Sequence, residues 1–143
     1  MPEYEIEFYE DDEGDEPVLR WLREELSPRK RRALGAAMNN VLQALGVKVC
    51  GTEFGRQLGT GLFEFRLRGM DLAKAAPGSV SVERDEAKML LRVFCHAHGD
   101  KLILLLGGYD KGEDTSAKRQ AQEIAIARRR LRDWQSRRRR GSR

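Results

Sequence analysis

The chain has little cysteine, few aromatic residues and no long apolar run, and each shortage excludes a class of protein. Its two cysteines, Cys50 and Cys95, are too few and too far apart for a disulfide framework or a zinc site. No apolar stretch approaches the length that crosses a bilayer, and the acidic N-terminus is unlike a signal peptide. We therefore expect one compact cytoplasmic domain, for which 143 residues provide an adequate core.

What the chain does have is strongly polarised charge. Its net charge is only +4, but its two ends are oppositely charged. Residues 1–25 carry 11 acidic and 2 basic side chains, and residues 118–143 carry 11 basic and 2 acidic ones. Such a basic end suggests a polyanion partner, most simply nucleic acid. A solvated tail without a specific partner is the alternative. Because residues 136–143 contain only Ser, Arg and Gly, we expect them to be disordered.

The hydrophobic periodicity predicts an α+β domain over residues 1–135. We expect a small antiparallel sheet of four or five strands, with an N-terminal helical hairpin and a C-terminal helix packed on it. The expected elements are a strand at 4–8, helices within 17–45 that restart at Ser27, and strands at 62–68, 89–95 and 102–106. A last helix, capped by Thr115 or Ser116, is expected to carry Ile124, Ala127, Leu131 and Trp134 on one face. Residues 46–60 are expected to be irregular, and residues 69–88 to form an insertion in which 79–83 could add a short strand.

The same alternation leaves a set of basic residues off the core. Arg66 and Arg68 project from one expected strand and Arg92 from another, while Tyr109 and Lys111 stand at the end of a third. If these strands are neighbours, the basic groups converge on one patch of the sheet. Arginine matches phosphate oxygens with a rigid fork of donors, and Lys, Tyr or His can transfer protons, so the patch would suit RNA cleavage.

Ordinary explanations compete with this one. Arginine on the open face of a sheet often serves solubility only, but Arg92 interrupts the apolar run from Met89 to Cys95, where a charge needs a partner. Glu64 could be that partner in a purely structural ion pair. Tyr109 could have only a structural role, as an aromatic residue that packs at the end of its strand.

Two histidines, His96 and His98, form a His-x-His pair on one strand face. The pair could share a metal, but no third ligand is evident nearby, so we expect no metal site. The remaining explanations are proton transfer, a contact with RNA, or a position at the strand end without a role.

In this order, the segments resemble the HigB-like branch of the RelE/ParE toxin superfamily, including its phage-derived members. The resemblance rests on Gly-Leu-Phe-Glu-Phe-Arg at 61–66, on Leu-Arg-Val-Phe at 91–94, and on the apolar strand at 103–111 that ends in Tyr-Asp-Lys. Weaker matches at 4–9, 17–22 and 123–128 extend it over most of the chain.

The resemblance implies a cytoplasmic toxin that cleaves mRNA on the ribosome without a metal or other cofactor, and a helix-turn-helix antitoxin as its partner. It places the catalytic basic positions on Arg66, Arg92 and Lys111, with Tyr109 as a further acid or base. Arg68, His96 and His98 become candidates for contacting RNA.

Two departures from the family pattern keep other functions open. The family usually ends its last strand with Phe-x-Lys-Lys, whereas Gly112 replaces the second lysine here. The insertion at 69–88 also lengthens the link between the two arginine strands. A non-catalytic RNA-binding or ribosome-binding module of the same fold is one alternative, and a gyrase poison of the ParE branch is another.

Overall fold

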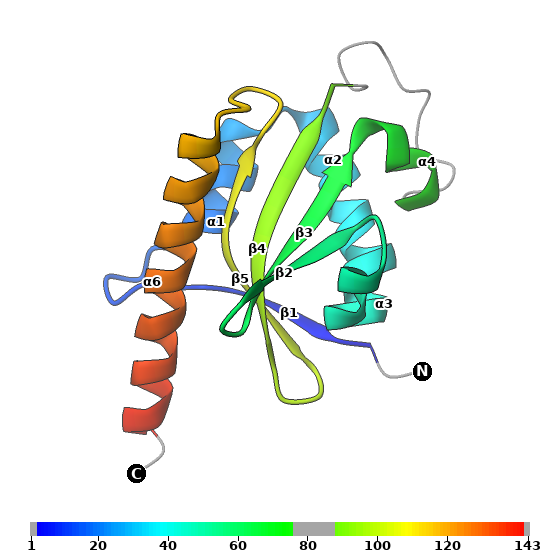
Figure 1. Ribbon diagram of the computed structural model, residues 1–143. Coiled ribbons are helices and arrows are strands. Elements are labelled where there is room, and N and C mark those ends of the chain that lie inside the picture. Colours follow the sequence, from blue (N-terminus) through cyan, green and yellow to red (C-terminus); the bar gives the residue numbers. More distant parts are fainter. Residues whose placement is uncertain (1–2, 76–87, 142–143) are drawn as a thin grey trace.

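The computed structural model describes residues 3–75 and 88–141 and shows an α+β domain built on one open sheet (Figure 1). Its five strands lie in the order β1-β5-β4-β3-β2. They are β1 (Glu5–Phe8), β2 (Gly55–Gly59), β3 (Leu62–Arg68), β4 (Leu90–His98) and β5 (Leu102–Asp110). The α+β class expected from the sequence is confirmed.

The sheet is mixed, which corrects the expectation of an antiparallel one. Strands β2 to β5 pair antiparallel with their neighbours, but β1 pairs with β5 in parallel, with Ile6 opposite Ile103. Alternating apolar residues identify a strand, but they do not reveal its direction beside a partner that is distant in sequence. A parallel pair needs a long crossover, and the whole chain between β1 and β5 provides it here.

Helical chain after β1 covers one face of the sheet. Its first segment comprises α1 (Pro17–Arg20) and η1 (Trp21–Glu25), and its second runs through α2 (Pro28–Ala37), η2 (Met38–Leu42) and α3 (Gln43–Leu45). Ser27 caps the second segment as expected, because its hydroxyl accepts a hydrogen bond from the Lys30 backbone N–H at 3.3 Å. Gly46 ends that segment with φ +57°, where a Cβ would lie only 2.5 Å from the ring of Tyr4.

The main core lies between these helices and the sheet. Alternate residues of the two central arginine strands point into it, namely Phe63, Phe65 and Leu67 of β3 and Leu91, Val93 and Cys95 of β4. The thiol of Cys95 is fully buried there. Because this face takes the apolar side chains, the polar residues of β3 and β4 are left to the opposite face.

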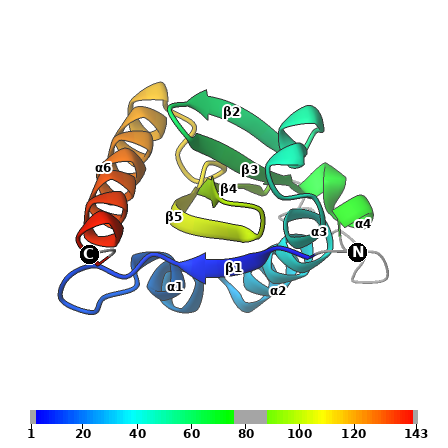
Figure 2. The ribbon, with the colours of Figure 1, turned by 90° about the horizontal axis from the view of Figure 1, so that it is seen from below.

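The opposite face carries α6 (Ala117–Gly141), which lies across the sheet from α2 (Figure 2). Ser116 caps α6 by accepting a hydrogen bond from the Arg119 backbone N–H at 3.1 Å. The expected stripe is confirmed, with Ala127, Leu131 and Trp134 buried against the sheet and Ile124 partly buried. No helix within residues 3–75 and 88–141 is both long and apolar enough to cross a membrane.

The arginine-rich C-terminal segment is helical, not disordered, as far as the structure describes it. Helix α6 continues through residues 136–141 to Gly141, while the last two residues lie outside the described range. Arginine favours helix, and Arg137 forms an ion pair with Asp133 one turn earlier at 2.9 Å. The guanidinium of Arg137 also donates to the backbone carbonyl of Glu10. Composition alone does not reveal these contacts.

Strand β2 was missed by the sequence analysis. It is a short edge strand whose residues Arg56 and Gln57 are exposed, so it lacks the alternation that marks a half-buried strand. The strand passes close to the 3₁₀ segment η3 (Gly46–Gly51), since a Cβ at Gly55 would lie 2.6 Å from the backbone of Val49. Gly55 lies in the segment expected to be irregular. The close approach to Val49 explains why a glycine is needed there.

Part of the expected insertion belongs to the core. Residues 69–75 form η4 (Gly69–Asp71) and α4 (Leu72–Ala75), and the side chains of Leu72 and Ala75 are buried in the main core. Residues 76–87 lie outside the described range, and with them the strand expected at 79–83.

Candidate functional site

Three of the predicted site residues form one row across the sheet. Arg66 of β3 lies opposite Arg92 of β4, which in turn lies opposite Tyr109 of β5. Cross-strand neighbours of this kind have Cβ atoms about 5 Å apart. The expected convergence of the two arginine strands is confirmed.

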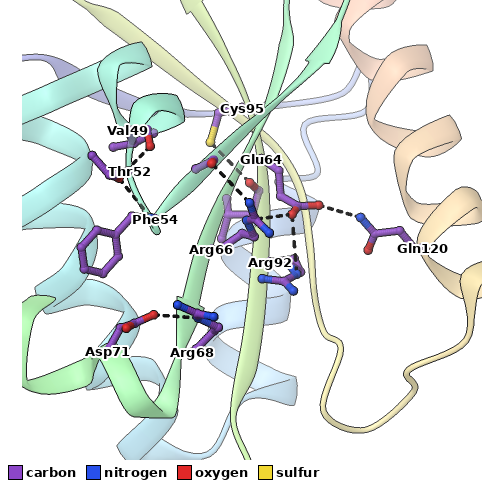
Figure 3. Close-up of polar contacts among 12 residues, drawn as sticks. Val49, Thr52, Phe54, Glu64, Arg66, Arg68, Asp71, Arg92, Cys95 and Gln120 are labelled. Atoms are coloured by element: carbon purple, nitrogen blue, oxygen red, sulfur yellow. Dashed lines mark hydrogen bonds and ion pairs between the residues drawn. The ribbon is translucent and has the colours of Figure 1, made fainter.

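A buried carboxylate holds the two arginines together (Figure 3). Glu64, only 2% exposed, approaches the Nε of Arg66 at 3.5 Å and the Nε of Arg92 at 3.6 Å with its Oε1. Its Oε2 accepts a hydrogen bond from the Nε2 of Gln120 at 2.6 Å. Glu64 is thus the partner that the sequence analysis considered for Arg92, and it serves Arg66 equally.

The arginine donors are only partly satisfied. The Nε and Nη1 atoms of Arg92 and the Nε of Arg66 are buried and have no hydrogen-bond partner within the described residues, although both guanidinium groups lie at ion-pair distance from Glu64. A buried donor without an acceptor costs about 1–3 kcal/mol. The side chain of Arg66 is 30% exposed and that of Arg92 is 8% exposed, so Arg66 is the more accessible of the two to a ligand.

The electrostatics of Arg92 reflect this crowding of like charge. Burial lowers the pKa of its guanidinium, and the neighbouring Arg66 and Arg68 lower it further, while Glu64 and Tyr109 act in the opposite direction. Arginine remains charged at any ordinary pH in spite of such shifts. An added negative charge beside Arg92 would relieve the repulsion from the other two arginines.

Tyr109 occupies the row but is fully buried beneath α6. Its ring stacks on Phe94 with centroids 6.2 Å apart, and the Arg119 guanidinium lies 5.1 Å from its centroid. Its hydroxyl donates to the side-chain oxygen of Gln120. Burial is the main cause that raises the pKa of Tyr109 to about 12, with Glu64 adding to it and Arg92 opposing it. The phenol is therefore protonated at neutral pH and shielded from solvent.

Helix α6 contributes a residue that the sequence analysis missed. Gln120 bridges Tyr109 and Glu64 and so ties the first turns of α6 to the arginine row. A signal for it existed, because Gln120 stands four residues before Ile124 and continues the apolar stripe of α6 with a polar side chain. A polar residue on a buried stripe needs a polar partner.

Lys111 and Arg68 lie at the next position along the strands. The Lys111 backbone N–H donates to the Leu90 carbonyl at 2.8 Å, and Leu90 lies opposite Arg68. The guanidinium of Arg68 is paired with Asp71 at 2.7 Å, and Lys111 is partly exposed. Both predicted basic residues are therefore beside the row, not in it.

The structure explains why a glycine follows Lys111. A Cβ at Gly112 would lie 2.6 Å from the carbonyl oxygen of Lys88, which is closer than any real side chain allows. The Gly112 N–H also donates to the Asp110 carboxylate at 2.9 Å. A second lysine at this position would need the backbone to move.

The histidine pair lies away from the arginines. His98 is six residues beyond Arg92 on β4, which corresponds to about 20 Å. His96 is buried, and its Nδ1 lies 2.7 Å from the Gly61 carbonyl. His98 is exposed and meets the ring of Trp134 edge to face. The predicted RNA-contacting set is therefore divided between two ends of the sheet.

Within the described residues, no group of three His, Cys, Asp or Glu side chains is placed to hold a metal ion. No protein-family model matches the chain, and a search of the curated proteins finds no relative. The arrangement of side chains is therefore the basis for inferring what the chain does.

Proposed function

We propose that the chain is an endoribonuclease toxin of the HigB-like branch of the RelE/ParE superfamily, with a RelE-like fold, that cuts mRNA on the ribosome. The observation that carries the proposal is the pair of Arg66 and Arg92 opposite each other on adjacent strands, with the buried carboxylate of Glu64 between them. Two guanidinium groups held this close suit a phosphate whose charge increases during a reaction.

The chemistry requires little else. The ribose 2′-oxygen loses its proton to water and attacks the adjacent phosphorus, the bond to the 5′-oxygen breaks, and the departing 5′-oxygen takes a proton from Lys111. A cyclic phosphate forms without a metal or another cofactor. The guanidinium groups of Arg66 and Arg92 would donate to the non-bridging phosphate oxygens. Each well-placed donor of this kind contributes roughly 3–4 kcal/mol to the stabilisation of a transition state.

Proton transfer involves the residues beside the arginines. Tyr109, with a pKa of about 12, is a poor base at neutral pH and its hydroxyl is committed to Gln120. We therefore assign Tyr109 to positioning the row, and Lys111, which is partly exposed beside it, to donating a proton to the departing 5′-oxygen. Arg68 extends the same basic surface toward the RNA strand.

The proposal includes a cytoplasmic location and a helix-turn-helix antitoxin as partner. Strong charge polarity supports an RNA partner, because the segment from residue 118 onward carries a balance of +9.

The test is induced expression in a bacterial host with mapping of the 5′ ends of cellular mRNA. New cuts inside translated frames are expected with the unmodified chain, and they should fall by about 100-fold or more with Arg92→Ala or Arg66→Ala. Arg32→Ala is the matched control, because Arg32 is an exposed arginine on α2, which packs on the opposite face of the sheet, and its loss should leave cleavage unchanged.

Other outcomes would replace the proposal. Growth arrest without mRNA cuts would favour a gyrase poison, and the absence of arrest would favour a non-catalytic binding module. Cuts that persist in both arginine variants, each shown to be folded by circular dichroism, would refute the assignment of the site.

A further inference from the structure

A second cluster of chemically active side chains lies at the far end of the sheet from the arginine row. It consists of His98 at the end of β4 together with Trp134, Gln135, Arg138 and Arg139 of α6, which line a hollow of about 390 Å³. Small-molecule sites commonly occupy about 300–1,000 Å³, so the hollow has room for one nucleotide.

Charge distinguishes this hollow from three others along the described residues. None of the described residues that line it is acidic, whereas each of three other hollows, located around α1 and the middle of α6, is lined by three carboxylates. The nearest carboxylate on the helix, Asp133, is occupied elsewhere: it accepts from the Tyr9 hydroxyl at 2.6 Å and pairs with Arg137. The lining of the hollow therefore carries net positive charge.

The hollow is also lined by two ring side chains, those of His98 and Trp134. His98 and Trp134 meet edge to face at 5.0 Å between centroids, and His98 remains exposed while Trp134 is buried behind it. The Arg138 guanidinium lies 4.8 Å from the centroid of Trp134, which orients it at the rim. Burial, then Arg138 and His96, lower the pKa of His98, so its imidazole is neutral at physiological pH.

These groups match the parts of a nucleotide. Arginine forks bind phosphate oxygens, a neutral imidazole offers a flat surface on which an unpaired base can stack, and the Gln135 amide can donate to and accept from a base edge. We propose that His98, Arg138 and Arg139 form a second RNA-binding site that holds one nucleotide of a single strand. The choice of RNA as the ligand rests on the proposed function.

The test measures binding without cleavage. The probe is a short fluorescein-labelled RNA with 2′-O-methyl groups throughout, whose 2′-oxygens cannot attack, and its Kd is measured by fluorescence anisotropy against salt concentration. Arg138→Gln combined with Arg139→Gln should raise Kd about tenfold or more at low salt. It should also reduce the slope of log K against log salt by about 1.4, the value for two phosphate contacts on a single strand. His98→Ala should raise Kd about fivefold or more, and His98→Phe should restore binding because it keeps a stacking ring.

The matched control removes the same charge elsewhere. Arg23→Gln combined with Arg129→Gln changes two exposed arginines outside the hollow, and Kd should change less than about threefold. Equal losses in both double variants would refute the site, because the tail would then act by charge alone. A fluorescent polyglutamate peptide that binds as tightly as the RNA, with the same dependence on Arg138 and Arg139, would show a site for acidic protein instead.

Failure of this inference is distinguishable from failure of the proposed function. Arg92→Ala should abolish mRNA cleavage, and in the Arg92→Ala chain the Arg138 and Arg139 substitutions should still raise Kd for the methylated RNA about tenfold or more. Loss of cleavage in Arg92→Ala with no effect of the Arg138 and Arg139 substitutions on binding would refute only the second site. The opposite pattern would refute only the proposed cleavage.

Discussion

Replacing Glu64 with glutamine removes the buried charge that balances Arg66 and Arg92 while keeping the size of the side chain. The carboxylate lies 3.5 and 3.6 Å from the two Nε atoms. Glutamine can still accept the hydrogen bond from Gln120 with its amide oxygen, so no cavity forms and no backbone contact is lost. The substitution therefore isolates the electrostatic contribution.

The expected loss of stability is the lost attraction to the two arginines minus the desolvation cost of the Glu64 carboxylate. At these distances, and with an effective dielectric constant of about 20, each attraction amounts to roughly 4–5 kcal/mol. The attraction to Arg66 is reduced by solvent, since its side chain is 30% exposed, whereas that of Arg92 is 8% exposed. Removing the carboxylate also recovers several kcal/mol of desolvation. We expect the free energy of unfolding to fall by about 3 kcal/mol.

Urea denaturation at neutral pH measures this loss, with an unchanged m-value as evidence that unfolding stays comparable. The matched control is Glu123→Gln, which removes a carboxylate from a more exposed pair with Arg119 on α6 and should cost less than about 1 kcal/mol. A loss below about 1 kcal/mol for Glu64→Gln would contradict the reasoning, because the two arginines would then not depend on the buried charge.

Two further predictions concern positions beside the row. Gly112→Lys should lower the free energy of unfolding by about 1–3 kcal/mol without increasing RNA cleavage, because its Cβ would lie 2.6 Å from the Lys88 carbonyl oxygen. Unchanged stability in urea denaturation would contradict this, because the backbone would then adjust to the side chain at little cost. The raised pKa of Tyr109, about 12 against an ordinary 10, means that its contribution to stability is complete below pH 10 and is lost as the pH rises toward 12. In a Tyr9→Phe background, which removes the other tyrosine with a pKa near 12, stability measured between pH 9 and 12 should fall more steeply with Tyr109 than with Phe at that position, and equal slopes would contradict this.

Local sequence patterns determine much of the candidate site. Alternation along β3 and β4 places Phe63, Phe65 and Leu67 in the core and therefore Arg66 on the other face, since a strand has only two faces. The apolar stripe of α6 and its Ser116 cap are likewise predictable, because both depend on neighbours within a turn or two. The apolar run around Arg92 marks that arginine as exceptional.

Contacts between distant segments decided most of the rest. The parallel pairing of β1 with β5 and the contact of Arg137 with Glu10 depend on partners far away in the chain, which periodicity does not encode. The burial of Tyr109 under Gln120 and the separation of His98 from Arg92 are of the same kind. Strand β2 pairs with the adjacent strand β3, but its exposed residues do not alternate and so gave no signal. The sequence by itself determined which residues face away from the core, because side-chain direction repeats locally. Only the tertiary structure decided which of them meet, because strand order and register are set by the packing of the whole domain.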